Sequence, residues 1–153
     1  MCSSDLVVLE AAGEVDFERI GCRVSLLANN GQQILAGLHP AAGGNGTAAC
    51  SGEMLLQALV SCAGTTLAAV ATSMGLTIQS ATVKATGKMD FRGTMGVSRE
   101  TPVGLTEIQV QFQLQTAIPQ ETILKLVQLT ERYCVVLRTL TDGTKLSCSI
   151  PDP

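Results

Sequence analysis

The sequence lacks tryptophan and is poor in aromatic residues, with three Phe and one Tyr among 153 residues. It also lacks a concentration of positive charge, because thirteen Asp and Glu outnumber ten Lys and Arg and the net charge is −3. Nucleic-acid binding depends on basic patches that neutralise phosphates and on aromatic rings that stack on bases. We therefore expect no nucleic-acid partner.

Charged residues are scarce at 15 %, whereas hydrophobic residues make up 46 % of the chain. So few charges leave little polar material to cover the surface. We therefore expect some apolar surface to be buried against a partner subunit. Disorder is excluded because it needs the opposite balance of residues. The length suits one domain, residues 1–153.

Histidine is limited to His39, and no two of the six cysteines form a C-x-x-C pair. Structural zinc sites are built from such clusters, so we expect neither a metal nor another cofactor. His39 has two interpretations, a surface side chain or a general base. The N-terminus shows no basic start followed by an apolar signal run. We therefore expect a cytoplasmic protein whose cysteines are free thiols rather than a disulfide framework.

Strand patterns occur in both halves of the chain. Apolar stretches at 22–28 and 32–38 flank Asn29-Asn30-Gly31, which predicts a hairpin turn. Residues 40–52 are rich in glycine and predict a mobile loop, although they lack the Lys of a phosphate-binding loop. Apolar and polar residues alternate over 105–115, which predicts a half-buried strand. Residues 78–90 and 145–150 are predicted to be further strands.

Residues 53–75 form the longest apolar segment, with Ser51 placed to cap a helix and Gly75 to end it. Interrupting hydroxyl residues and the absence of basic flanks argue against a membrane span. A helix that is apolar nearly all round is buried on all sides, so we expect a central helix. A second helix is predicted from Pro119 to Tyr133, with a short helical turn at 134–140. The element order predicts an α+β fold with an antiparallel sheet.

Two cysteines lie in contrasting contexts. Cys62 lies mid-helix among apolar residues, where a cysteine is often an inert buried side chain unless a donor from elsewhere in the sequence reaches it. Cys134 lies between two helical pieces, where the dipole of the second would favour a thiolate. The arginines beside it, Arg132 and Arg138, either support that thiolate or point to solvent.

Three separated segments resemble the OsmC family, also called the osmotically inducible and organic hydroperoxide resistance family. They are EMLLQALVSC with TLAAVATSMG within residues 51–75, KMDFRGTMGV at 88–97, and ERYCVVLRTL at 131–140. The resemblance implies an OsmC-like α+β fold, with an antiparallel sheet of six strands wrapped around a long buried central helix in an intertwined homodimer. It also implies a soluble stress-response protein that does not associate with membranes.

The resemblance further implies a redox pair. Cys62 matches the cysteine that attacks peroxide, and Cys134 matches the resolving cysteine. The implied activity is an antioxidant thiol-dependent peroxidase: organic hydroperoxide oxidises Cys62 to a sulfenic acid, Cys134 condenses with it, and an external dithiol reduces the disulfide. Met54, Leu55 and Leu59 are candidate residues to line the substrate site. The alternative is a non-catalytic OsmC-like protein that binds a small apolar ligand in the dimer cleft.

The sequence departs from the hydroperoxide-resistance branch just before the central helix. That branch carries Asn/Ser-Pro-Glu, whereas this chain has Ser51-Gly52, and Glu53 matches the glutamate common in the wider family. The branch also uses an N-terminal arginine, held by its glutamate, to stabilise the thiolate. Arg23 is the first candidate for that role and Arg19 the second. Val135 stands where the family usually has proline after its second cysteine.

Overall fold

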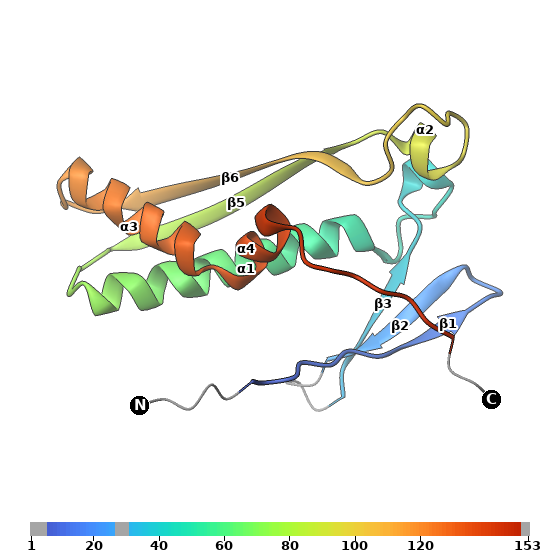
Figure 1. The fold of residues 1–153 in the computed structure, drawn as a ribbon, viewed down its shortest axis with the longest axis horizontal. Coiled ribbons are helices and arrows are strands. Elements are labelled where there is room, and N and C mark those ends of the chain that lie inside the picture. Colours follow the sequence, from blue (N-terminus) through green and yellow to red (C-terminus); the bar gives the residue numbers. More distant parts are fainter. Residues whose placement is uncertain (1–5, 27–30, 151–153) are drawn as a thin grey trace. The chain divides into compact units, whose positions relative to one another are not determined.

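The computed structural model describes residues 6–26 and 31–150. The chain forms two compact units, described in turn (Figure 1). The first unit contains the described residues up to Met54 together with Asp90–Gly104, and the second contains Leu55–Met89 and the residues from Leu105 onward. The assignment of residues 1–153 to a single domain stays a prediction.

The first unit is built on a small sheet with strand order β1-β2-β3-β4. Its strands are β1 (Gly13–Asp16), β2 (Gly21–Ser25), β3 (Gln33–Gly37) and β4 (Ala49–Cys50). The predicted antiparallel pair is confirmed as β2 and β3, with Cys22 opposite Ala36. The turn residues Asn29 and Asn30 lie outside the described residues, whereas Gly31 has a φ of 77°, a value that favours glycine.

Residues 40–52 are more ordered than the predicted loop. Pro40–Ala42 form a 3-10 turn, and the Nδ1 atom of His39 caps it by accepting the N–H of Ala41 at 3.0 Å. Further on, β4 pairs in parallel with β3, an exception to the predicted antiparallel sheet. Strand β1 was not predicted either, because its four residues are nearly all exposed and carry no alternating apolar pattern.

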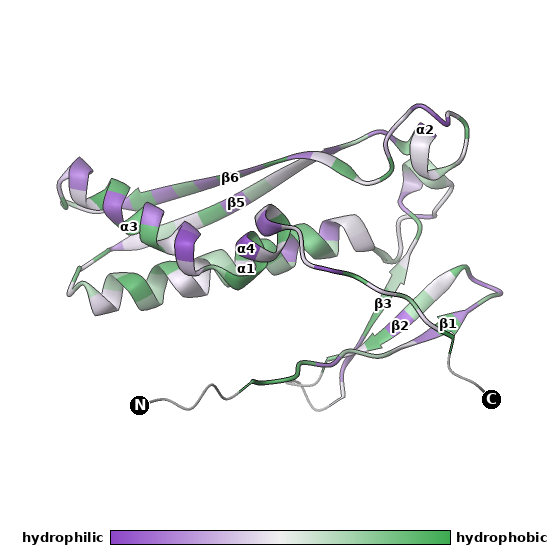
Figure 2. Ribbon diagram, viewed as in Figure 1, coloured by the Kyte–Doolittle hydropathy of each residue, from purple (hydrophilic) through white to green (hydrophobic). Residues whose placement is uncertain are grey.

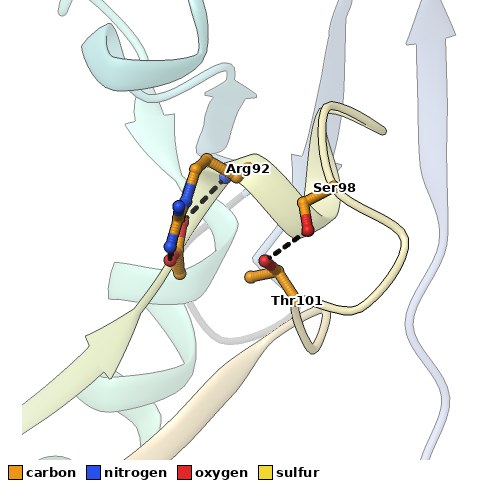
Figure 3. A network of polar contacts seen from close by, with 4 residues as sticks. Arg92, Ser98 and Thr101 are labelled. Carbon is orange, nitrogen blue, oxygen red and sulfur yellow. Dashed lines mark hydrogen bonds and ion pairs between the residues drawn. The ribbon is translucent and has the colours of Figure 1, made fainter.

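The first unit also contains a short helix, α2 (Phe91–Thr94). Asp90 caps it by accepting the N–H of Arg92, and the guanidinium of Arg92 returns to the same carboxylate at 2.6 Å. Hydrogen bonds from Arg92 hold the pKa of Asp90 at about 2. The Phe91 ring stacks on His39 at 4.7 Å, and Ser98 and Thr101 are hydrogen-bonded across the loop that follows (Figure 3). These contacts give Asp90 and Arg92 a structural role at this turn.

The second unit packs helices on a two-stranded sheet. Strands β5 (Ser80–Met89) and β6 (Leu105–Gln115) pair antiparallel along their length. Helix α1 (Ser51–Ser73) enters this unit from Leu55 onward, and α3 (Gln120–Tyr133) and α4 (Val135–Asp142) follow β6. The alternation predicted for 105–115 is confirmed in β6, where hydrophobic and hydrophilic residues alternate along the strand (Figure 2).

The core of the second unit follows one face of α1. Leu59, Ala63, Leu67 and Ala71 are buried and recur every four residues, the spacing that places side chains in line on a helix. Side chains from β5 and β6 pack against this line, and Leu126 of α3 is fully buried in the same core. The small Ala63 and Ala71 let the sheet approach the helix closely.

Helix α1 departs from prediction in two ways. It was expected to be buried on all sides, but within this chain only the line of four residues is buried. Ser51 is already helical rather than the residue before the helix. At the other end Gly75 ends the helix as predicted, with φ 67° and the N–H of Leu76 bonded to the carbonyl of Ala71.

Two further predictions differ from the structure. Residues 145–150 form no strand; Leu146 and Ile150 are 86 % and 96 % exposed, and no strand among the described residues pairs with them. Pro119 precedes α3 instead of occupying its first turn.

Among the described residues, α1 is long and apolar enough to cross a membrane by length and composition alone, a property shared by core helices of soluble proteins.

The core of α3 supplies a stability prediction. We expect Leu126→Ala to lower the free energy of unfolding by ~2–5 kcal/mol, because it leaves a cavity beside Leu67 and Ala71. Urea denaturation measures the change. Leu124→Ala is the matched control, since Leu124 lies on the same helix but is 55 % exposed. Equal losses in the two variants would contradict the packing described.

Candidate functional site

Cys62 lies in the middle of α1, between the buried residues Leu59 and Ala63. It is half-buried and packs beside Leu59, Ala63 and Cys134, which form one apolar cluster. The spacing of that helix places Cys62 next to the buried line rather than within it. Its sulfur is therefore against the core on one side without being sealed by it.

Cys134 lies at the break between α3 and α4. Its N–H bonds the carbonyl of Thr130 at 2.9 Å, which ends α3, and its extended backbone (ψ 109°) starts α4 in a new direction. The residue is fully buried. The predicted break at this cysteine is confirmed. The change in chain direction points the first residues of α4 toward Cys62.

Hydrogen-bond donors from three sources surround the sulfur of Cys62. The backbone N–H groups of Val135 and Val136 are directed at it from the start of α4, where no side chain caps the helix. The Cys134 thiol and the Thr66 hydroxyl contact it as well. Free amides at a helix N-terminus carry partial positive charge and favour a thiolate.

The donors decide the ionisation of Cys62. Burial acts to raise the pKa of the Cys62 thiol, but the amides of Val135 and Val136 and the two side-chain donors outweigh it, so the pKa lies below its ordinary value. No local donor was predicted for this residue, although Thr66 lies four residues further on the same helix. The amides of Val135 and Val136 come from more than seventy positions further along the chain.

The pKa of the Cys134 thiol shifts in the opposite direction. Burial raises the pKa of its thiol, and the neighbouring Cys62 sulfur raises it further, against the opposing effect of the Leu137 amide. The expectation that the α4 dipole would stabilise a thiolate on Cys134 is therefore wrong. The amides of Leu137 and Val136 in α4 do act to lower the pKa of Cys134, but burial and the neighbouring Cys62 sulfur outweigh them.

The neighbouring arginines do not act on the sulfurs. Arg138 pairs with Asp142 at 2.6 Å, one turn along α4. The guanidinium of Arg132 lies over the ring of Tyr133, 5.5 Å from its centroid. The side chains of Arg132 and Arg138 therefore face solvent, which is one of the two predicted alternatives.

The other candidate residues belong to the first unit. Arg23 donates to Asp16 at 2.9 Å, and Arg19 donates its backbone N–H to the same carboxylate, which together lower the pKa of Asp16. Glu53 lies in the first turn of α1. The structure thus brings Cys62 and Cys134 together, and the roles of Arg23 and Glu53 stay predictions.

A groove of about 580 Å³ adjoins the cysteine cluster within the second unit. Its apolar walls include Leu59, which belongs to the cluster that holds Cys134, and Ile108 and Leu137, which pack against that cluster. Glu107, Glu131 and Arg138 lie among its lining residues. Of the candidate lining residues, Leu59 is in this groove, whereas Met54 and Leu55 are not. Within the described ranges no group of three His, Cys, Asp or Glu side chains could hold a metal ion.

The comparisons with protein families and with solved structures agree with each other. The model of the family described as OsmC-like protein matches residues 44–149. An OsmC-like protein from Mycoplasma pneumoniae superposes with a TM-score of 0.69 at 18 % identity, covering 88 % of this chain and 86 % of that one. No curated protein matches the sequence.

Two organic hydroperoxide resistance proteins are also similar in structure. The one from Legionella pneumophila has a TM-score of 0.68 at 12 % identity and covers 89 % of this chain and 92 % of its own. The one from Elizabethkingia anophelis has a TM-score of 0.68 at 13 % identity, with 90 % and 91 % covered. At these identities the similarity shows the fold.

The opposite pKa shifts predict unequal reactivity of the two thiols. We expect iodoacetamide at neutral pH to alkylate Cys62 faster than Cys134, because a lower pKa leaves a larger fraction of Cys62 as the reactive thiolate. Peptide mass spectrometry of a time course measures both rates. As the pH is lowered, the alkylation rate of Cys62 should persist to a lower pH than the alkylation rate of a free cysteine peptide. Faster modification of Cys134 would contradict the assignment.

Proposed function

The chain belongs to the OsmC-like protein family, and from that premise we propose that it is a thiol-dependent peroxidase that reduces organic hydroperoxides. Family membership and structural neighbours named organic hydroperoxide resistance proteins support a role connected with peroxides. The observation that carries the mechanism is the contact between Cys62, with its lowered pKa, and Cys134, with its raised pKa.

The first step is oxidation of Cys62. Its thiolate attacks the outer oxygen of the hydroperoxide, the O–O bond breaks, and the alkoxide that leaves takes up a proton to become an alcohol. Cys62 is then a sulfenic acid. A lowered pKa suits this role, since the thiolate is the nucleophile.

The second step is resolution by Cys134. Its sulfur attacks the sulfenic sulfur of Cys62, a disulfide forms, and the hydroxyl leaves as water after taking a proton. The raised pKa keeps Cys134 protonated until then, so only one of the two adjacent sulfurs carries charge in the resting site. An external dithiol restores both thiols by exchange and becomes a disulfide itself.

The surroundings of the sulfurs favour an apolar peroxide. The groove of about 580 Å³ shares Leu59 and Leu137 with the cysteine cluster and has room for a small organic molecule. A homodimer in the cytoplasm remains part of the proposal. The homodimer is supported by the exposed faces of α1, which are apolar enough to be covered by a second chain. The cytoplasm is supported by the need for a reducing environment.

Arg23 and Glu53 are proposed to complete the site. The carboxylate that bonds Arg23 in this chain is Asp16 rather than Glu53. Glu53 precedes Cys62 by nine residues on the same helix, which is ~13 Å along the axis. An indirect role for Glu53 is therefore favoured over contact with Cys62 on its own helix.

Substitution of each cysteine tests the proposed activity. We expect Cys62→Ser to abolish consumption of cumene hydroperoxide, because it removes the nucleophile. Cys134→Ser should allow a single oxidation that stops at the Cys62 sulfenic acid, which a dimedone adduct would report. In the unaltered protein, mass spectrometry should find a Cys62–Cys134 disulfide. Cys148→Ser is the control, since that thiol is exposed and outside the cluster.

The same experiment separates the peroxidase from the alternative of non-catalytic binding. The apolar groove beside the cysteines is the observation that favours a ligand-binding protein. Persistence of the peroxide with both thiols reduced, together with a small apolar molecule retained in native mass spectrometry, would overturn the peroxidase and support the binding protein.

Removal of Arg23 tests its assignment. The proposed role of Arg23 predicts that Arg23→Ala raises the pKa of Cys62 and slows its alkylation at neutral pH, because a neighbouring cation favours the thiolate. The pH dependence of Cys62 alkylation gives the measurement. Arg99→Ala is the control, because Arg99 is an exposed arginine of the same unit. An unchanged pH profile in Arg23→Ala would remove this residue from the site.

A further inference from the structure

We propose that Glu131 sets the charge preference of the groove beside the cysteine cluster, so that the groove favours uncharged organic molecules over those that carry a carboxylate. The inference deepens the proposed function and rests on it for its consequence, because it names uncharged hydroperoxides as the substrate class. Glu131 is assigned as a residue that determines specificity, and it takes no part in breaking or forming bonds.

Glu131 and the cysteine cluster border the same groove. Glu131 lines the groove together with Leu59, and Leu59 is a buried member of the cluster that holds Cys134. Along α3, Glu131 precedes Cys134 by three residues, a spacing that brings residues to the same side of a helix. A molecule that occupies the groove therefore lies beside both the cluster and Glu131.

Glu131 carries the unbalanced charge of this groove. The other charged residues of its lining are Glu107 and Arg138. Glu107 is paired with Lys88 at 3.0 Å, and Arg138 is paired with Asp142 at 2.6 Å. In the part of the chain that the structure describes, no ion pair or hydrogen bond involves the side chain of Glu131. The groove therefore keeps a net negative charge.

The side-chain donors of the lining are already engaged. A free guanidinium binds carboxylates well, but that of Arg138 donates to Asp142, which lies one turn further along the same helix. The hydroxyl of Thr106 donates to the carbonyl of Lys88, and the hydroxyl of Thr141 donates to the carbonyl of Arg138. A carboxylate that entered the groove would have to displace one of these partners.

The field of Glu131 extends across the groove. At about 580 Å³ the groove is comparable in width to the screening length of ~10 Å at 0.1 M salt. Apolar walls such as Leu105 and Val110 concentrate the field of a charge at their border. A carboxylate on the bound molecule is therefore repelled, whereas an uncharged molecule of the same shape is not. Because Glu131 is exposed to solvent, the preference should be severalfold rather than absolute.

The test uses two alkylating reagents with the same reactive group, iodoacetanilide and its para-carboxylate. Peptide mass spectrometry gives the rate at Cys62 for each reagent. The ratio of the charged to the uncharged rate is then divided by the same ratio for a free cysteine peptide. A change in the ionisation of the Cys62 thiol affects both reagents equally and cancels in this ratio.

Glu131→Gln and Glu131→Lys form a charge series for this measurement. Glu121→Gln is the matched control, because it removes the same charge from the same helix, ~15 Å away along the axis, and Glu121 does not line the groove. A urea unfolding curve for each variant shows whether it is folded.

We expect the ratio to lie below one in the unaltered protein and to rise by about threefold in Glu131→Gln at low salt, the size of an interaction between exposed charges. It should rise further in Glu131→Lys and stay at its original value in Glu121→Gln. At 1 M salt the effect of Glu131→Gln should shrink, since the screening length falls to ~3 Å. An unchanged ratio in folded Glu131→Gln, or an equal rise in Glu121→Gln, would overturn the proposal.

The alkylation needs no peroxide, so its failure is distinguishable from failure of the proposed function. Cumene hydroperoxide and its para-carboxylate provide the same comparison for the reaction, and their relative kcat/KM should follow the alkylation ratio. A shifted ratio in a protein that consumes neither peroxide would uphold Glu131 and refute the peroxidase. Consumption of both peroxides with an unshifted ratio would do the reverse.

Discussion

The hydrogen bonds from the first turn of α4 to the sulfur of Cys62 are the interaction on which the candidate site depends. They exist because the chain leaves its helical course at Cys134 and starts again at Val135 with uncapped amides. A side-chain cap would have satisfied those amides locally and left the sulfur with fewer donors. One backbone break thus positions the second thiol and supplies the donors for the first.

The packing of the second unit keeps this arrangement in place. Cys134 is buried beside Leu59 and Ala63, so α4 cannot move away from α1 without exposing apolar surface to water. Strands β5 and β6 close the other side with Val83, Ile108 and Phe112. Stability and chemistry therefore share the same residues, and substitutions in this cluster are expected to affect both.

The two thiols illustrate how burial and donors compete. Burial raises the pKa of both sulfurs, but only Cys62 receives enough donors to reverse the effect. Two chemically identical groups therefore have opposite pKa shifts, which suits the proposed roles of nucleophile and resolving thiol. Such opposed shifts in neighbouring groups are typical of catalytic sites. They support a functional interpretation of the pair.

Local pattern was sufficient to predict much of the fold. The alternation in 105–115, the apolar length of α1, the glycine after it and the break at Cys134 all depend on neighbours along the chain, and each is confirmed. The strand predicted at 145–150 was wrong because a strand needs a partner that local pattern cannot supply. The contact between Cys62 and Cys134, 72 positions apart, came from family resemblance. Only the tertiary structure decided which of the two sulfurs has the lower pKa, because the balance between burial and donors from distant segments depends on how those segments pack.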